Sequence, residues 1–225
     1  MNVLSNPALI KNLFFLFFLL LALEGCGPSQ RSPYRNQGTS KEQRIDHFYQ
    51  RYKNGKNIKA ALENGQKYLP YIHQIFYEHG LPPELAYLPL LESGFRTSVT
   101  SHSGAKGMWQ FTEGTAKDFG LKINWLRDER LDWKKSTVSA ARYLKQLGKR
   151  FDNNWELALA GYNGGPNYVA RLVKQKGQHN YWALPLRKET YEYVPKYIAM
   201  LRVAEKHYPQ LYFTGAPKVW IASRT

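Results

Sequence analysis

Apolar residues at helical spacing, in short segments that end at glycine or proline, constrain the fold of this chain most. Tyr68, Ile72, Ile75 and Phe76 follow one helical face, and Gly80 is placed to end that helix. No stretch sustains the apolar and polar alternation of a half-buried strand. The chain is therefore expected to be mainly α, either all-α or α with at most a small β element.

Other segments carry the same helical signals. They are residues 45–52, 83–91, 115–119, 136–148, 154–165, 167–177 and 189–208. Pro83 suits the first turn of a helix, and Pro89 is expected to kink the helix over 83–91. Ser136 is expected to be the N-cap of the helix that follows it.

The first 26 residues have the composition of an export signal. Lys11 precedes an apolar run at residues 13–23, which is too short to span a bilayer as a helix. The only cysteine, Cys26, follows this run in "LALEGCG". This order resembles a bacterial lipoprotein signal and implies cleavage before Cys26 and lipidation of that residue. Gly27 implies, by the same resemblance, sorting to the outer membrane. An ordinary secretory signal is the alternative.

The charge and the cysteine count narrow the classes of function. Lys and Arg number 32 against 17 Asp and Glu, a net charge of +15, which favours anionic partners such as a membrane or an acidic polymer. A single cysteine excludes an internal disulfide framework and a cysteine-based zinc site. Export argues against an intracellular nucleic-acid role, and no nucleic-acid motif is present.

Glu92 lies in the apolar run "PLLESGF", which is a poor environment for a carboxylate. Burial disfavours the charged form, and the carbonyl groups at a helix C-terminus oppose it as well. Both effects raise the pKa, as a general acid that works near neutral pH requires. The alternative is an exposed glutamate at a frayed helix end.

Two glycine-containing stretches offer further candidate site residues. Gln110 in "GAKGMWQF" can both donate to and accept from a sugar, and Met108 could line a pocket or belong to the core. Tyr162 and Asn163 stand where a helix meets two glycines in "ALAGYNGGP", a position that also suits a helix C-cap.

Four motifs occur in order, namely "ES" at 92–93, "GMWQ" at 107–110, "GYNGG" at 161–165 and "ETYEYVPK" at 189–196. Together they resemble the signature of family 1 lytic transglycosylases. That family shares a lysozyme-like fold with goose-type lysozyme and the soluble lytic transglycosylase catalytic domain. "PLLESGF", "DERLD" and "WELALAGYN" are most similar to subgroup D of the membrane-bound lytic murein transglycosylases. The resemblance covers roughly residues 65–205.

The resemblance implies cleavage of the MurNAc–GlcNAc β-1,4 bond of peptidoglycan without water, leaving 1,6-anhydroMurNAc ends. Glu92 would be the catalytic residue, first as acid and then as base, so that neither a second carboxylate, a metal nor a cofactor is needed. Tyr193, directly before "VPK", is favoured over Tyr191 as a site tyrosine. The residues implied to bind substrate are Ser93, Met108, Gln110, Tyr162, Asn163 and Tyr193.

The expected organisation is a signal peptide over 1–25, a lipid-anchored flexible linker over 26–41, a catalytic domain over 42–210 and a tail over 211–225. The expected partners are peptidoglycan glycan strands and, through the lipid, a membrane facing the periplasm, with no nucleic acid.

One alternative function is that of a lysozyme-type hydrolase, which would need a second carboxylate. Asp118, Asp128, Glu129 and Asp132 are candidates for it. The other alternative is a non-catalytic wall-binding lipoprotein.

Overall fold

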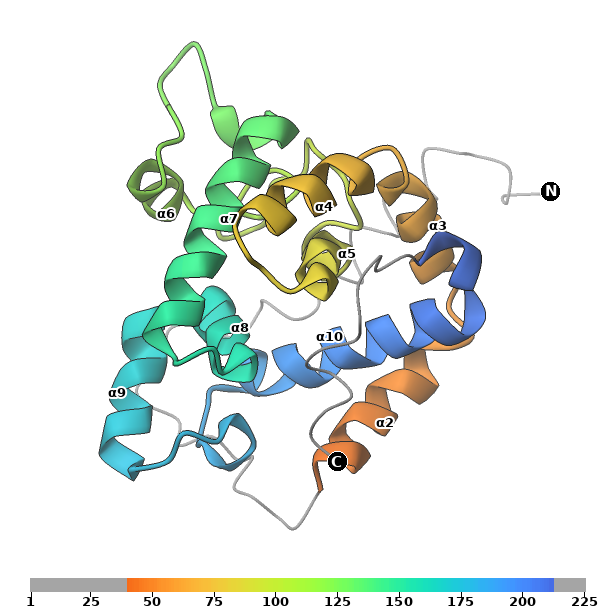
Figure 1. Cartoon of the computed structure of the whole chain (residues 1–225), viewed down its shortest axis with the longest axis vertical. Helices are drawn as coiled ribbons and strands as arrows, with labels where there is room; N and C mark the ends of the chain where they lie inside the picture. The colour runs from red at the N-terminus through yellow and green to blue at the C-terminus, as the bar shows by residue number, and fades with distance from the viewer. Residues whose placement is uncertain (1–39, 213–225) are drawn as a thin grey trace, which may run out of the picture. The chain divides into compact units, whose positions relative to one another are not determined.

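The computed structural model describes residues 40–212. The predicted signal peptide, Cys26 and most of the predicted linker and tail lie outside the described residues. Tertiary contacts divide the chain into residues 1–31 and 32–225, and everything described below belongs to the second unit. Figure 1 shows how its helices are arranged.

The described residues are mainly helical, with little strand pairing. The α-helices are α2 (Lys41–Tyr52), α3 (Lys56–Gly65), α4 (Leu69–Glu78), α5 (Leu88–Glu92), α6 (Glu113–Asp118), α7 (Trp133–Arg150), α8 (Trp155–Gly164), α9 (Pro166–Lys176) and α10 (Lys188–His207). The 3-10 helices are η1 (Pro83–Tyr87), η2 (Glu129–Leu131), η3 (Tyr181–Ala183) and η4 (Pro209–Leu211). Isolated bridges pair Thr100 with Lys106, Lys106 with Phe111, and Ile123 with Asp128. The prediction of a mainly α chain with a small β element is confirmed.

Two local predictions were wrong, and hydrogen bonding explains both. The helix expected over 83–91 is split into η1 and α5, and Pro89 lies in the first turn of α5 instead of kinking a longer helix. A proline lacks the N–H that a continuous helix would need there, so the chain starts a new helix. Ser136 lies inside α7, whose N-cap is Asp132, because that carboxylate accepts from the backbone N–H groups of Lys134 and Lys135.

Pro195 lies inside α10 and is accommodated by residues from two other elements. A proline cannot donate to the carbonyl four residues earlier, which here belongs to Tyr191. That carbonyl accepts instead from Arg44 Nη2 at 2.5 Å and from Tyr181 Oη at 2.6 Å. The Arg44 guanidinium also lies 3.5 Å from the Tyr191 ring centroid. α2 and η3 thereby hold the first half of α10 in place.

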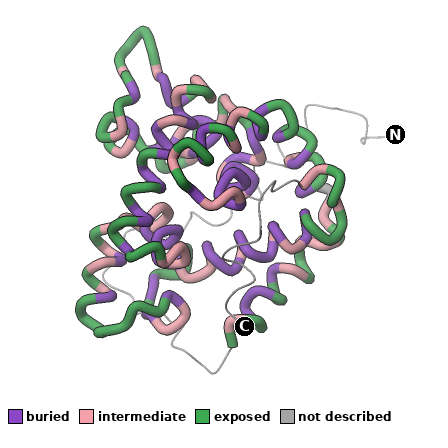
Figure 2. The backbone as a smooth tube through the Cα atoms, viewed as in Figure 1, coloured by how far each residue is buried: buried purple, intermediate pink, exposed green. Residues whose placement is uncertain are grey.

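α10 lies at the centre of the packing. It contacts α2, α3, α5 and α8, while α8 also packs against α7 and α9. Figure 2 shows that η1, α5 and the inner side of α10 are buried. The buried apolar residues of α10 include Val194, Tyr197, Ile198 and Leu201. α5, α8 and α10 therefore meet around one region, which contains most of the predicted site residues.

Candidate active site

Glu92 is the last residue of α5 and is only partly exposed to solvent. Its pKa is raised from the ordinary 4.5 to about 7, mainly because burial removes hydration from the carboxylate. A hydrogen bond from Tyr193 lowers this pKa, and the negative charge of Glu189 raises it. A carboxyl group with such a pKa holds a proton near neutral pH and can also release it.

The direction of this pKa shift agrees with the sequence prediction, but one of its causes differs. The predicted causes were burial and the helix C-terminus. α5 has five residues, so few peptide dipoles are aligned behind Glu92. The charge that adds to the effect of burial comes from Glu189 at the start of α10, a motif residue for which no role was predicted.

Tyr193 and Tyr162, on two neighbouring helices, lie near Glu92. Tyr193 on α10 is buried, and its hydroxyl donates a short hydrogen bond to Glu92 Oε1. Tyr162 on α8 donates to the backbone oxygen of Trp109 at 2.6 Å. Burial and the nearby Glu92 charge raise the pKa of both tyrosines well above the usual value, so both stay protonated donors. Tyr191 packs on Arg44 instead. Of the two motif tyrosines that were candidates, Tyr191 and Tyr193, it is therefore Tyr193 that contacts Glu92.

Ser93 connects α5 to the glycine-containing loop. It is buried, and its hydroxyl donates to the backbone oxygen of Met108 at 2.8 Å. Met108 is fully buried, so its side chain belongs to the core. A direct contact of either side chain with a glycan stays a prediction, which this burial does not favour. Their observed contact fixes the distance between Glu92 and the loop.

The loop beside Glu92 has a backbone that few sequences adopt. Gln110 has a φ of 49°, and its side-chain amide donates to the oxygens of Gly107 at 2.8 Å and Val99 at 3.3 Å. Gly107 has a φ of 79°, and an added Cβ would lie 1.9 Å from the backbone oxygen of Arg130. Phe95, close to Glu92 in sequence, also has a positive φ of 58°. Such strain clusters at functional sites.

Asn163 connects α8 to Glu189. Its Nδ2 donates to Glu189 Oε1 at 3.1 Å, whereas its buried Oδ1 accepts no hydrogen bond from another described residue. A buried acceptor without a donor is costly unless a ligand or water supplies one.

The next residue, Gly164, leaves room for Thr190, because an added Cβ would lie 2.5 Å from Thr190 Oγ1. Thr190 belongs to the motif "ETYEYVPK", but the sequence analysis did not predict it as a site residue.

The four carboxylates considered for a hydrolase have structural partners or lie exposed. Asp128 binds Arg130 at 2.7 Å and Lys106 at 3.2 Å, which lowers the pKa of Asp128 to about 2. Hydrogen bonds from Lys135 and Lys122 lower the pKa of Glu129. The remaining two are Asp132, which caps α7, and Asp118, which lies exposed at the end of α6.

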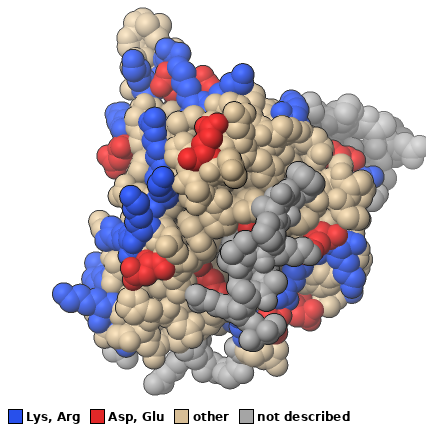
Figure 3. Space-filling view, viewed as in Figure 1, with Lys and Arg blue, Asp and Glu red and all other residues tan. Residues whose placement is uncertain are grey.

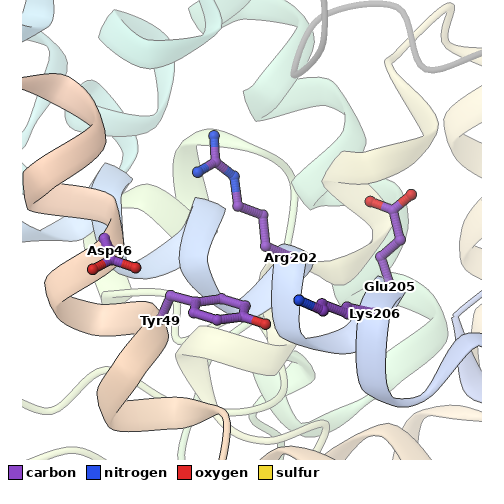
Figure 4. Close-up of a pocket in the computed structure, with 5 residues that line it drawn as sticks. All are labelled: Asp46, Tyr49, Arg202, Glu205 and Lys206. Atoms are coloured by element: carbon purple, nitrogen blue, oxygen red, sulfur yellow. The ribbon is translucent and has the colours of Figure 1, made fainter.

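A hollow of about 370 Å³ lies between α2 and the C-terminal part of α10 (Figure 4). It is lined by Asp46, Tyr49, Arg202, Glu205 and Lys206. Arg202 already binds Glu42 at 2.6 Å. No predicted site residue lines this hollow, so it is separate from the site around Glu92.

Comparison with known families decides the classification of the chain. The profile described as "Transglycosylase SLT domain" matches residues 70–185, slightly more than half of the chain. The chain belongs to this family. The matched residues include Glu92, Gln110 and Asn163, while Tyr193 lies beyond them.

Relatives and solved structures agree with this classification. The SLT domain chain is 33% identical over 168 residues to membrane-bound lytic murein transglycosylase D of Escherichia coli K12, which covers 72% of this chain and 37% of the relative. The 70 kDa soluble lytic transglycosylase of Escherichia coli superposes with a TM-score of 0.54 at 18% identity, over 79% of this chain and 33% of that one. An inactive mutant of lytic transglycosylase Slt from Pseudomonas aeruginosa gives 0.52 at 18% identity, over 85% and 40%. These structural matches confirm the lysozyme-like transglycosylase fold.

The chain spans a little over a third of the length of the Escherichia coli relative that it matches. None of the helices within residues 40–212 combines the length and hydrophobicity that a membrane crossing requires. In the same residues, no three His, Cys, Asp or Glu side chains are grouped so that they could hold a metal ion.

Proposed function

We propose that this SLT domain protein is a peptidoglycan lytic transglycosylase that cleaves the MurNAc–GlcNAc β-1,4 bond without water. The observation that carries the proposal is the Glu92 carboxyl group, whose pKa of about 7 and hydrogen bond from Tyr193 suit proton transfer in both directions. The family membership supplies the reaction class.

In the proposed first step, protonated Glu92 gives its proton to the glycosidic oxygen while the bond between that oxygen and C1 of MurNAc breaks. The 2-acetamido oxygen of the same sugar bonds to C1 and stabilises the positive charge. In the second step, ionised Glu92 takes the proton of the C6 hydroxyl as O6 bonds to C1 and the acetamido oxygen leaves. No water is consumed, and Glu92 ends protonated, as it began.

The neighbours of Glu92 support both steps. The Tyr193 hydroxyl stabilises the ionised form, which is needed after the first step, while burial and Glu189 stabilise the protonated form, which is needed before it. The unpartnered Oδ1 of Asn163 can accept from a substrate N–H or O–H group. Gln110 and Tyr162 are proposed to orient the sugar, whereas Ser93 and Met108 hold the loop in place.

The test is digestion of purified peptidoglycan followed by mass spectrometry of the products. We expect anhydro-ended muropeptides, each lighter by one water than a lysozyme product. Glu92→Gln should fold and lose activity by about 10²–10⁴-fold, because it cannot transfer the proton. Glu63→Gln is a matched control, since its exposed side chain pairs with Lys59 on α3. Full activity of Glu92→Gln would contradict the assignment of this site.

A lysozyme-type hydrolase is the second candidate function. The observation that favours it is a second carboxylate, Glu189, near Glu92. Glu189 is the carboxylate that acts electrostatically on Glu92, and a hydrolase needs a second carboxylate to activate water. Its hydrogen bond from Asn163 gives it a structural role instead. Products with reducing ends, together with inactivity of Glu189→Gln, would select the hydrolase.

We further propose that the chain is exported, cleaved before Cys26 and anchored by lipid at Cys26 in the outer membrane, facing the periplasm. The support is the apolar run at residues 13–23 followed by Cys26 and Gly27. Relatives named as membrane-bound lytic murein transglycosylases are consistent with a membrane location. Cys26→Ser should move the protein to the soluble periplasmic fraction. Finding the unsubstituted protein already soluble there would overturn the anchor.

A further inference from the structure

Trp125 and Leu126 form an apolar tip that the proposed reaction does not use. Their exposed fractions are 91% and 74%, far above those of the buried aromatic residues around Glu92. The tip lies between α6 and α7, in the loop that projects from the other helices at the upper left of Figure 1. Two adjacent large apolar side chains with this exposure indicate an interaction surface.

A hydrogen-bonded turn over residues 124–127 holds the two side chains of the tip in their exposed positions. Asn124 N donates to the Arg127 oxygen at 2.8 Å, and Arg127 N donates back to the Asn124 oxygen at 3.3 Å. The Asn124 Oδ1 accepts from the N–H groups of Leu126 at 3.1 Å and Arg127 at 2.9 Å. Trp125 and Leu126 occupy the two central positions of this turn, so the hairpin presents them outward.

The buried carboxylate of Glu129 connects the base of the hairpin to the rest of the domain. Glu129 is 5% exposed, and its carboxylate binds Lys135 Nζ at 2.6 Å and Arg127 Nε at 3.2 Å. It also accepts from the backbone N–H of Lys122 at 2.9 Å. Because Lys135 belongs to the first turn of α7, the tip is held at the start of that helix.

α7 adds a line of positive charge that begins beside the tip. Its sequence contains no acidic residue. At the angle per residue of an α-helix, its exposed cations Lys134, Arg142, Lys145 and Lys149 fall within roughly 80° of one another. These four residues, called here the cation stripe, form no ion pair with another described residue. Figure 3 shows Lys and Arg gathered along the edge formed by α7 and α9, below the projecting loop.

We propose that the tip and the cation stripe together form a docking surface for an anionic phospholipid bilayer. A tryptophan ring prefers the boundary between headgroups and acyl chains, and a leucine side chain gains from entering the acyl region. Lysines and arginines beside them attract the phosphates of anionic lipids. An acidic glycan could pair with the cation stripe but has no apolar layer that Leu126 could enter. An anionic bilayer offers both the negative charge and the apolar layer. Docking would hold the domain against the membrane independently of any lipid on Cys26.

The test uses the full chain reconstituted in vesicles whose lipids carry bromine on their acyl chains, with Trp125 as the probe. Fluorescence of the Trp125→Phe variant comes from the other tryptophans. Subtracting it from the fluorescence of the unsubstituted protein gives the quenching of Trp125 alone. We expect quenching in vesicles that contain phosphatidylglycerol and much less in phosphatidylcholine alone. Leu126→Ser should lower the docking equilibrium constant by about tenfold, and Lys145→Gln with Lys149→Gln by about tenfold or more.

Matched controls separate docking from general effects. Tyr77 is 86% exposed and lies on α4, so Tyr77→Ser removes an equally exposed ring without changing the quenching. Lys53→Gln with Lys67→Gln removes the same charge after α2 and α3 and should also leave the quenching unchanged. Docking should weaken at high salt, because 1 M salt shortens the reach of charges to about 3 Å.

Two results would overturn the proposal. One is equal quenching of Trp125 in anionic and neutral vesicles, or none in either. The other is an unquenched Trp125 together with loss of binding to purified peptidoglycan in Trp125→Ser, which would assign the tip to a glycan contact.

Discussion

Glu92 and the pair Asp128 and Glu129 are carboxylates held by opposite sets of partners. Glu92 faces a tyrosine hydroxyl and a second negative charge, and its pKa is raised to about 7. Asp128 and Glu129 contact arginine and lysine side chains, and the pKa of Asp128 is lowered to about 2. Burial by itself does not separate them, since Glu129 is among the buried residues.

The partners of a carboxylate therefore decide whether it stabilises the fold or can take part in the reaction. A carboxylate paired with cations is ionised at all ordinary pH values and stabilises the folded state. Glu92 instead has a pKa suited to proton exchange and costs stability whenever it is ionised. Substitutions at each of these carboxylates test the difference.

Asp128→Asn should cost the most stability. Arg130 is 4% exposed, and losing its carboxylate leaves a buried guanidinium without a counter-charge, so unfolding should become easier by about 3 kcal/mol. Urea denaturation measures this loss. Asp118→Asn, on exposed α6, should change stability by less than about 0.5 kcal/mol. In the unsubstituted protein, the Asp128 contribution should be present above about pH 4 and lost as pH falls through 2.

Glu92→Gln should stabilise the protein at high pH and not at low pH. The folded pKa of about 7 lies above the ordinary 4.5, so the folded state binds the proton more tightly than the unfolded chain. The penalty is absent below pH 4.5 and grows as pH rises through 7. Thermal unfolding at pH 8 should favour the variant by about 1–3 kcal/mol, with no such gain at pH 4. Equal stability of the two proteins at pH 8 would contradict the comparison.

Gly164→Ala tests how tightly the site region is packed. The added Cβ would lie 2.5 Å from Thr190 Oγ1, next to Glu189, so the variant should lose about 1–3 kcal/mol of stability as well as activity. Gly114→Ala is the matched control on α6, where an added Cβ meets nothing within 4 Å. That change should be neutral or stabilise by up to about 1 kcal/mol. Similar effects of both changes would show that contact with Thr190 is unimportant.

Glu189→Gln and Tyr193→Phe should shift the pH dependence of activity in opposite directions. Removing the negative charge of Glu189 lowers the pKa of Glu92, and removing the Tyr193 hydroxyl raises it. The pH at which kcat/KM falls on the alkaline side should therefore decrease in the first variant and increase in the second. Profiles that shift in the same direction would contradict the partner assignments. Because the introduced glutamine amide can still accept a hydrogen bond from Asn163, the first variant isolates the charge.

Local signals in the sequence determined the helical class and several helix ends. Gly80, Gly94, Gly120 and Gly177 all have the positive φ that a glycine beyond a helix supplies, and the predicted helices end near them. These features depend on a few neighbouring residues, so a single sequence specifies them. The α3 helix was missed, and the Ser136 N-cap was wrong because Asp132, four residues earlier, bonds the free N–H groups.

The upward shift of the Glu92 pKa was predicted correctly because the apolar neighbours that bury this carboxyl group are adjacent to it in sequence. The identity of its partners was decided by tertiary structure. Tyr193 and Glu189 lie about a hundred residues away in the chain. They reach Glu92 through the packing of α10 against α5 and α8, and Arg44 and Tyr181 hydrogen-bond the Tyr191 carbonyl that Pro195 leaves free. A pKa depends on distances between groups, and packing sets those distances when the groups are remote in the chain.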